Sequence, residues 1–138
     1  KAYISAFSGY SSAVYVLTHF YKLWGEKELL DEAINFINEI EQHVEKDTTF
    51  DLLNGSAGAL LVLLNFYKAT GFQKALDIAI KCGDHLLKNA VKVNGGIAWT
   101  ISPKHTPLTG LSHGTSGIAL ALIRLNEETG EQNYLNAA

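Results

Sequence analysis

Apolar residues recur at helical spacing along most of the chain, and stretches that are apolar on all sides alternate with stretches that are apolar on one side. The stretch from Ala57 to about Ala69 is apolar nearly all round, which predicts a helix that is buried on every side. The stretch after Gly71 carries its apolar residues three or four positions apart, with lysines and aspartates between them, which predicts a helix with one wet face. Residues 30–44 show the same one-sided pattern. The chain is therefore expected to alternate between buried and amphipathic helices.

Three segments of the chain align with one another on their glycines, without gaps. Each segment begins near a leading glycine and has a second glycine sixteen residues later. The leading glycines are Gly9, Gly55 and Gly114, and the second glycines are Gly25, Gly71 and Gly130. The second glycine of each pair predicts a left-handed residue that ends the buried helix. Each repeat is thus predicted to be a helical hairpin, with repeats at about 8–46, 54–90 and 113–138.

Stacked hairpins can form an open solenoid or a closed double ring of helices. The fully buried first helix favours the closed ring, because the concave face of a solenoid is normally wet. Three hairpins cannot close such a ring, the chain has no initiator Met, and it ends at Ala138 inside a predicted helix. We therefore predict an all-α fold, an (α/α) toroid, of which residues 1–138 are a single fragment cut from a longer protein.

Residues 91–111 break the repeat. The leading glycines are 46 and then 59 residues apart, so about thirteen residues are inserted before the third repeat. The Asn94-Gly95-Gly96 sequence is a turn signal, the residues from Gly96 to Ile101 predict a short strand, and two prolines keep the chain irregular beyond it. We expect a short irregular or β insertion that leads directly into His113.

Composition excludes several classes of protein. The chain is 47% apolar and 18% charged with a net charge of -3, so it is not disordered. Its eleven basic residues are scattered among fourteen acidic ones, which argues against a nucleic-acid partner. One cysteine excludes a disulfide scaffold and fits a reducing compartment, so we expect a cytoplasmic protein. No run reaches about 18 apolar residues, so no transmembrane segment is expected.

The residues just before the leading glycines are the candidates for chemistry. Parallel buried helices bring their N-terminal ends to one face, where free N–H groups and the helix dipole favour anions. Asp51 precedes the buried helix of the second repeat, and His113 precedes that of the third. An acid and an imidazole at neighbouring helix ends can act as an acid/base pair, so we predict that both are catalytic. A simpler interpretation stays open, in which Asp51 or Asn54 caps a helix and His113 fills a turn.

The other chemically versatile side chains have weaker patterns around them. Structural or surface roles are expected for the three histidines inside predicted helices, His19, His43 and His85. His105 lies in the irregular segment, and its role stays open. Cys82 has no cysteine or histidine at ligand spacing, so neither a metal nor a nucleophile role is expected. Trp99 is expected to pack in the core or to wall a cleft.

Residues 108–119, Leu-Thr-Gly-Leu-Ser-His-Gly-Thr-Ser-Gly-Ile-Ala, resemble the histidine-containing repeat of the lanthionine synthetase C-like family. Residues 51–58, Asp-Leu-Leu-Asn-Gly-Ser-Ala-Gly, are similar to the preceding repeat, which carries the family's acidic residue. Residues 95–99 resemble the short segment ahead of the histidine. The resemblance covers essentially the whole chain, and the form of the repeats is closer to bifunctional lanthipeptide synthetases than to stand-alone cyclases.

The resemblance implies a double ring of helices and a chemistry. Lantibiotic members add a cysteine thiol of a precursor peptide to dehydroalanine or dehydrobutyrine, which makes a thioether ring. By position, His113 matches the family histidine proposed for acid/base work, and Asp51 matches the acidic residue near it. In these members a zinc ion, held by two cysteines and a histidine, binds the thiolate. The partners implied are a precursor peptide and the rest of the chain's own ring.

The chain departs from the family in its metal ligands. It has no Cys-His-Gly motif, and Cys82 is not at a ligand position. We therefore expect no cofactor and no metal ligands in this chain, zinc in the full-length parent, and an inactive fragment. The sequence also leaves three other functions to be considered: a relative that handles glutathione or a protein partner, a carbohydrate-active (α/α) barrel with Asp51 as general acid, and a tetratricopeptide-like scaffold. The 46-residue period and the buried first helices count against the scaffold.

Overall fold

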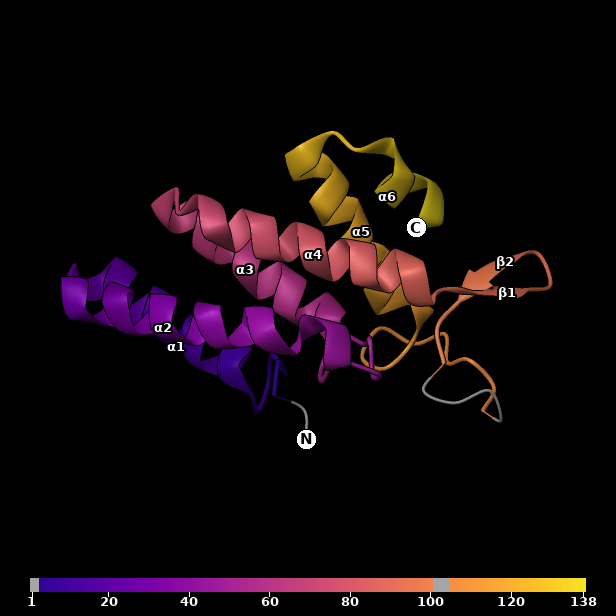
Figure 1. Ribbon diagram of the computed structural model, residues 1–138, viewed down its shortest axis with the longest axis horizontal. Coiled ribbons are helices and arrows are strands. Elements are labelled where there is room, and N and C mark those ends of the chain that lie inside the picture. The colour runs from indigo at the N-terminus through magenta and orange to yellow at the C-terminus, as the bar shows by residue number, and fades with distance from the viewer. Residues whose placement is uncertain (1–2, 101–104) are drawn as a thin grey trace.

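A computed structural model describes residues 3–100 and 105–138 of the protein. In these residues six α-helices form three consecutive antiparallel hairpins (Figure 1). The pairs are α1 (Tyr10–Trp24) with α2 (Lys27–His43), α3 (Ser56–Thr70) with α4 (Gln73–Asn89), and α5 (Thr115–Thr129) with α6 (Gln132–Ala137). A short 3-10 helix, Val44–Lys46, follows α2. The prediction of an all-α fold built from helical hairpins is confirmed.

The glycine between the two helices of each hairpin has the left-handed conformation that its position predicts. Gly25, Gly71 and Gly130 have φ values of 72°, 71° and 74°. Each donates its N–H to the carbonyl four residues earlier, at 2.7–2.8 Å, which closes the first helix of its hairpin. The next helix begins two residues later, so the turn is tight and the two helices lie antiparallel.

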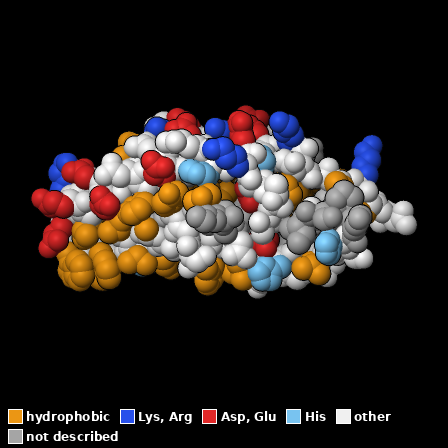
Figure 2. All heavy atoms as spheres, turned by 60° about the horizontal axis from the view of Figure 1, so that its bottom comes forward, with side chains coloured by type: hydrophobic (Ala, Val, Ile, Leu, Met, Phe, Trp, Pro, Cys, Tyr) orange, Lys and Arg blue, Asp and Glu red, His pale blue; other side chains and the backbone are white. Residues whose placement is uncertain are grey.

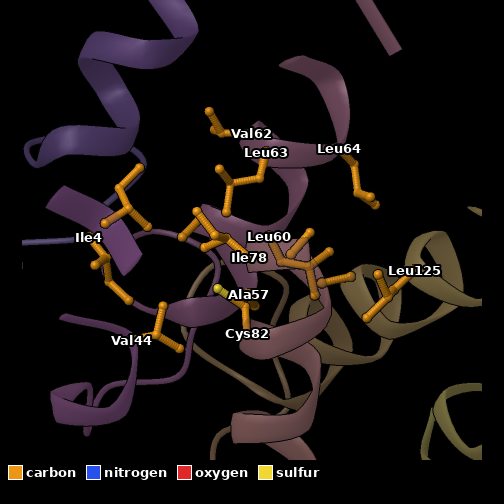
Figure 3. Packing of buried hydrophobic residues seen from close by; sticks show 14 of the residues in the cluster. Ile4, Val44, Ala57, Leu60, Val62, Leu63, Leu64, Ile78, Cys82 and Leu125 are labelled. Atoms are coloured by element: carbon orange, nitrogen blue, oxygen red, sulfur yellow. The ribbon is translucent and has the colours of Figure 1, made fainter. Parts of the chain in front are cut away.

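Helix α3 is the centre of the molecule. It contacts α1 on one side, α5 on the other and its own hairpin partner α4, and nine of its fifteen residues are buried. Leu60 and Leu63 are fully buried, and Figure 3 shows them in the core cluster together with Ile78 and Cys82 of α4. An apolar surface on all sides was predicted for this helix, and packing on three neighbours explains why it is needed.

Helix α1 occupies the same place in its repeat but is covered on fewer sides. Val16 and Phe20 are 46% and 38% exposed, whereas Val62 and Phe66, which align with them in α3, are 7% and 0% exposed. Figure 2 shows the resulting band of hydrophobic side chains along the side of the molecule where α1 lies. The face of α1 that meets α3 is buried, so the same apolar pattern has two outcomes in the two repeats.

The insertion between the second and third hairpins contains a small antiparallel β-hairpin. Strand β1 (Val91–Val93) pairs with β2 (Gly96–Ala98), and Gly95 in the turn has a φ of 89°. The predicted strand was too long, because the chain leaves the sheet after Ala98 and Trp99 becomes buried. Its end, Ile101, lies outside the described residues. Strand β1 was not predicted, because three exposed residues give no burial pattern.

Among the described residues, none of the helices has the length and apolar character that crossing a bilayer requires. The longest helices, α2 and α4, have 17 residues each.

Candidate functional site

The site forms where the turns before α3 and α5 meet. With the spacing of the leading glycines, Asp51 aligns with Gly110, and Asn54 aligns with His113. The two turns therefore occupy equivalent places in the repeat but carry the predicted side chains at different positions. Asp51 stands at the first of the four aligned positions of its turn, and His113 stands at the fourth position of the other turn. The acid and the imidazole belong to different hairpins, and only the packing of the hairpins can join them.

Asp51 and His113 are in direct contact. The Nδ1 atom of His113 lies 2.8 Å from Oδ2 of Asp51, across 62 residues of sequence. A carboxylate only accepts hydrogen bonds, so Nδ1–H of His113 is the donor. The Asp51 side chain is 6% exposed and that of His113 is 49% exposed. The structure thus brings together the two residues that the sequence predicted as a pair, with the acid inside and the imidazole at the surface.

The carboxylate of Asp51 is oriented by its own turn as well. Its Oδ1 accepts the main-chain N–H of Asn54 at 2.7 Å, which leaves Oδ2 for the imidazole. Because Nδ1–H of His113 is committed to Asp51, the other ring nitrogen, Nε2, carries the lone pair of the neutral ring. Within residues 3–100 and 105–138, Nε2 has no hydrogen-bond partner. The arrangement presents an oriented base at the surface of the site.

The simpler interpretation, in which Asp51 or Asn54 caps a helix and His113 fills a turn, is met only in part, because α3 has no side-chain cap hydrogen bond while His113 does lie in the turn before α5. The N-caps of α3 and α5 are Gly55 and Gly114, both with extended backbone, and neither helix has a side-chain cap hydrogen bond. Asp51 satisfies a turn N–H rather than a helix N–H, and the imidazole of His113 bonds to another hairpin. Asp51 thus bonds within its own turn and to the next turn, and neither side chain bonds at a helix cap.

Glycines in the first turns of α3 and α5 allow the turns to approach one another. A Cβ on Gly117 would strike the carbonyl oxygen of Leu111 in its own turn and lie 3.2 Å from the Cβ of Leu52 in the neighbouring turn. Gly58 repeats this arrangement one hairpin earlier, against the carbonyl oxygen of Leu52 and the Cβ of Ala6. These glycines therefore allow the turns to pack closely, which brings the turn of Asp51 and the turn of His113 together.

A cavity of about 340 Å³ lies beside the pair. Its described lining consists of Thr49, Asp51, Asn54, Trp99, Thr100, His105, Thr106, Pro107, Leu108, His113 and Ile118. Trp99 is only 4% exposed and donates its Nε1–H to the carbonyl of Leu86 at 2.8 Å. This tryptophan therefore fulfils both predicted roles, because it packs into the core and also walls the cavity.

Comparison with protein families agrees with this arrangement. The model of the family described as "Lanthionine synthetase C-like protein" matches residues 1–138. The chain belongs to the lanthionine synthetase C-like family. A search of curated proteins gave no match. The family resemblance seen in the sequence around Asp51 and His113 is thus confirmed over the full length of the chain.

Lantibiotic members of the lanthionine synthetase C-like family are expected to hold zinc, and the residues described here do not fit it. Within residues 3–100 and 105–138, no group of three histidine, cysteine or acidic side chains is arranged so that it could hold a metal ion. Cys82 is fully buried, and burial raises the pKa of its thiol far above the usual range, with the charge of Asp47 adding to the effect. No step of the chemistry is therefore assigned to a metal held by these residues.

The histidines inside helices have ordinary packing roles. His19 and His43 each bond to a main-chain carbonyl four residues earlier in the same helix, at 2.9 Å. His85 bonds through Nε2 to the carbonyl of Asp47 at 2.8 Å. His105, whose role the sequence left open, lines the cavity beside His113. Sequence reasoning missed Thr49 as a lining residue, since nothing in the pattern singles out a threonine in this turn.

Proposed function

We propose that this chain carries the acid/base part of a lanthipeptide cyclase, which adds cysteine thiols of a precursor peptide to dehydroalanine or dehydrobutyrine. The hydrogen bond between Asp51 and His113 at the edge of a cavity carries this proposal. It joins an imidazole, which can take and give a proton near neutral pH, to a buried carboxylate that orients it. Membership of the lanthionine synthetase C-like family supports the same chemistry.

The proposed reaction needs one proton to be moved. Nε2 of His113 takes the proton of the peptide thiol while sulfur forms a bond to the β-carbon of the dehydroamino acid. The electron pair of the broken double bond then becomes an enolate, and the α-carbon takes the proton back from Nε2–H. Asp51 stabilises the charged imidazole between the two transfers, because its Oδ2 accepts the Nδ1–H. The proton that leaves the thiol is the one that the α-carbon receives, so the addition neither gains nor loses atoms, and the His113 ring returns to its neutral form.

The cavity suits a peptide side chain better than a sugar. Its described lining contains a single carboxylate, that of Asp51, whereas glycoside hydrolysis generally uses two. The lining combines Trp99, Pro107 and Leu108 with threonine and histidine side chains, which fits a small apolar group with a polar backbone. The proposal therefore favours a cyclase over a carbohydrate-active barrel. We propose that this cyclase acts in the cytoplasm, in keeping with the one cysteine of the present chain.

The test is ring formation by the cyclase that contains this chain, since we propose that the chain alone is inactive. Ring closure does not change the peptide mass, so unreacted thiols are labelled with an alkylating reagent and counted by mass spectrometry. The variant His113→Ala should slow loss of free thiol by about 10²- to 10⁴-fold, the usual contribution of general acid–base catalysis. His19→Ala removes an exposed histidine of α1 that lies outside the cavity and should leave the rate unchanged. An unchanged rate in His113→Ala would refute the proposal.

A further inference from the structure

Asp47, which lies four residues before Asp51, accepts an unusual number of hydrogen bonds. Its Oδ1 accepts the N–H of Thr49 at 2.9 Å. Its Oδ2 accepts the N–H of Phe50 at 3.1 Å, and both the N–H and the hydroxyl of Ser56, at 2.7 and 2.6 Å. One carboxylate thus connects the start of the turn before α3 with the first residue of that helix.

The other two repeats build this connection differently. Ser56 aligns with Tyr10 in the first repeat and with Thr115 in the third. The N–H groups of those two residues donate to main-chain carbonyls, of Tyr3 at 2.8 Å and of Leu108 at 2.9 Å. In the second repeat the carboxylate of Asp47 accepts this bond instead. The N–H of the first helical residue is therefore bound by a side chain in the turn that carries Asp51 and by the backbone in its two counterparts, although this turn also has main-chain bonds such as Ala57 N–H to the Phe50 carbonyl at 3.1 Å.

The backbone of this turn differs accordingly. Phe50 has a φ of 64°, and among the described residues it is the only one other than glycine with a positive φ. The aligned residues, Ile4 and Thr109, do not share that conformation. A bulky residue adopts the left-handed region only when its surroundings hold it there. Asp47 supplies such a constraint, because it binds the Phe50 N–H directly.

We propose that Asp47 is a positioning residue, whose carboxylate holds the turn before α3 in the shape that directs Asp51 to His113. Phe50 immediately precedes Asp51, so the left-handed backbone of Phe50 sets the direction in which Asp51 leaves the turn. His85 of α4 also holds the backbone of Asp47 in place, since its Nε2 lies 2.8 Å from the Asp47 carbonyl oxygen. The importance of this role for catalysis rests on the proposed function of the Asp51–His113 pair.

The spectroscopic test uses the chain labelled with ¹⁵N in its histidines. Asp47→Asn keeps the size of the side chain but replaces one acceptor oxygen with an NH2 group, which cannot accept hydrogen bonds. We expect the ¹⁵N resonances of His113 Nδ1 and Nε2 to shift toward those of the Asp51→Asn variant, in which the pair is broken directly. A cyclase containing Asp47→Asn should also form rings about 10²-fold more slowly, as expected when a reacting group is displaced by about an ångström.

The control is Tyr134→Phe, which removes a 2.7 Å hydrogen bond to Asp84 between α6 and α4, away from the cavity. It should lower the melting temperature and leave the His113 resonances in place. Unchanged His113 resonances in Asp47→Asn, with a lowered melting temperature, would show a merely structural residue and overturn the proposal.

If Asp47→Asn does not fold, Ser56→Ala removes only the hydroxyl donor. The His113 resonances should then shift in the same direction but by less, and no shift would overturn the proposal. Because the resonances are read without substrate, they separate the two proposals. A shift in Asp47→Asn together with normal ring formation in His113→Ala would contradict only the proposed function.

Discussion

The turns before α3 and α5 occupy equivalent places in their repeats but present their side chains in opposite ways. In the first turn, Asp51 is 6% exposed and shares its oxygens between the turn and His113. In the second turn, His113 is 49% exposed, and Gly110 stands where the first turn has its acid. The second turn is closed by main-chain and hydroxyl bonds, such as Thr115 N–H to the Leu108 carbonyl. The turn before α3 thus holds a buried carboxylate, and the turn before α5 places an imidazole in the lining of the cavity.

This difference shows how one repeat can present different side chains at the same position in different copies. Ser5 aligns with Asp51 in the first repeat, and its hydroxyl also reaches the next turn, where it donates to the carbonyl of Leu53 at 2.9 Å. Contact from one turn to the next is therefore a property of the repeat itself. The second repeat has a carboxylate at that position, and the third repeat has an imidazole within its reach. A carboxylate at one position of the repeat and an imidazole at another thus meet across neighbouring turns.

The largest effect is expected from breaking the pair at its buried end. Asp51→Asn loses the negative charge and one acceptor oxygen of the side chain. Nδ1–H of His113 is then no longer held, and the imidazole can rotate or change tautomer. Ring formation by the cyclase containing this chain should fall by about 10²-fold or more, as measured by labelling of free thiols. Asp31→Asn, at a carboxylate of α2 that is 54% exposed, should match the parent. A rate equal to that of Asp31→Asn would remove Asp51 from the mechanism.

Moving the acid from one turn to the other tests the comparison more sharply. In Asp51→Gly combined with Gly110→Asp, the carboxylate stands in the same turn as His113. We expect no rescue of ring formation, because an acid at this position bonds to the main-chain N–H three residues later, as Asp51 does to Asn54. The space around Gly110 is open, so the new side chain can be accommodated. Recovery of the rate would show that the contact between hairpins is unnecessary.

A smaller effect is expected from separating the turns. A methyl group at Gly117 meets the Leu111 carbonyl and the Leu52 side chain, so Gly117→Ala should lower the free energy of unfolding by about 1–3 kcal/mol. Gly110→Ala is the matched control, because a Cβ there meets nothing within 4 Å and its φ is not positive. Urea denaturation of both variants measures the difference. Equal stability of the two variants would mean that the turns do not depend on close packing.

The smallest effect concerns packing away from the turns. Burial, and then the hydrogen bond to Asp84, raise the pKa of Tyr134, which is 2% exposed. An unfolded tyrosine loses its proton near pH 10, so above that pH the unfolded chain has lost the proton while the folded chain keeps it. The free energy of unfolding should therefore fall as the pH rises past about 10, and should not change through this group below it.

Melting temperatures between pH 9 and 11 provide the measurement for this effect. Tyr134→Phe should flatten the decline, although it starts from a lower value at neutral pH because it lacks the hydrogen bond to Asp84. The same slope in both proteins would assign the alkaline loss to another group. Cys82 is the next candidate, since burial also raises the pKa of its thiol.

The hydrophobic pattern was enough to predict the helices and where they end. Apolar residues at helical spacing report which faces are buried, and a left-handed glycine after a helix is a local requirement, so Gly25, Gly71 and Gly130 are readable from sequence. The pattern could not predict strand β1, because its three residues are all exposed. It also could not distinguish α1 from α3, since exposure depends on which helices lie alongside.

The residues of the candidate site could be predicted from the sequence, but the contact between them could not. Repeat alignment and the family resemblance singled out Asp51 and His113, because both positions follow from local spacing. Only the packing of the second hairpin against the third decided that Oδ2 of Asp51 meets Nδ1 of His113. The role proposed for Asp47 was not predicted either, because it depends on hydrogen bonds that form only in the folded chain. Local periodicity records burial, whereas the direction of a side chain is decided by backbone angles and contacts that only the folded chain contains.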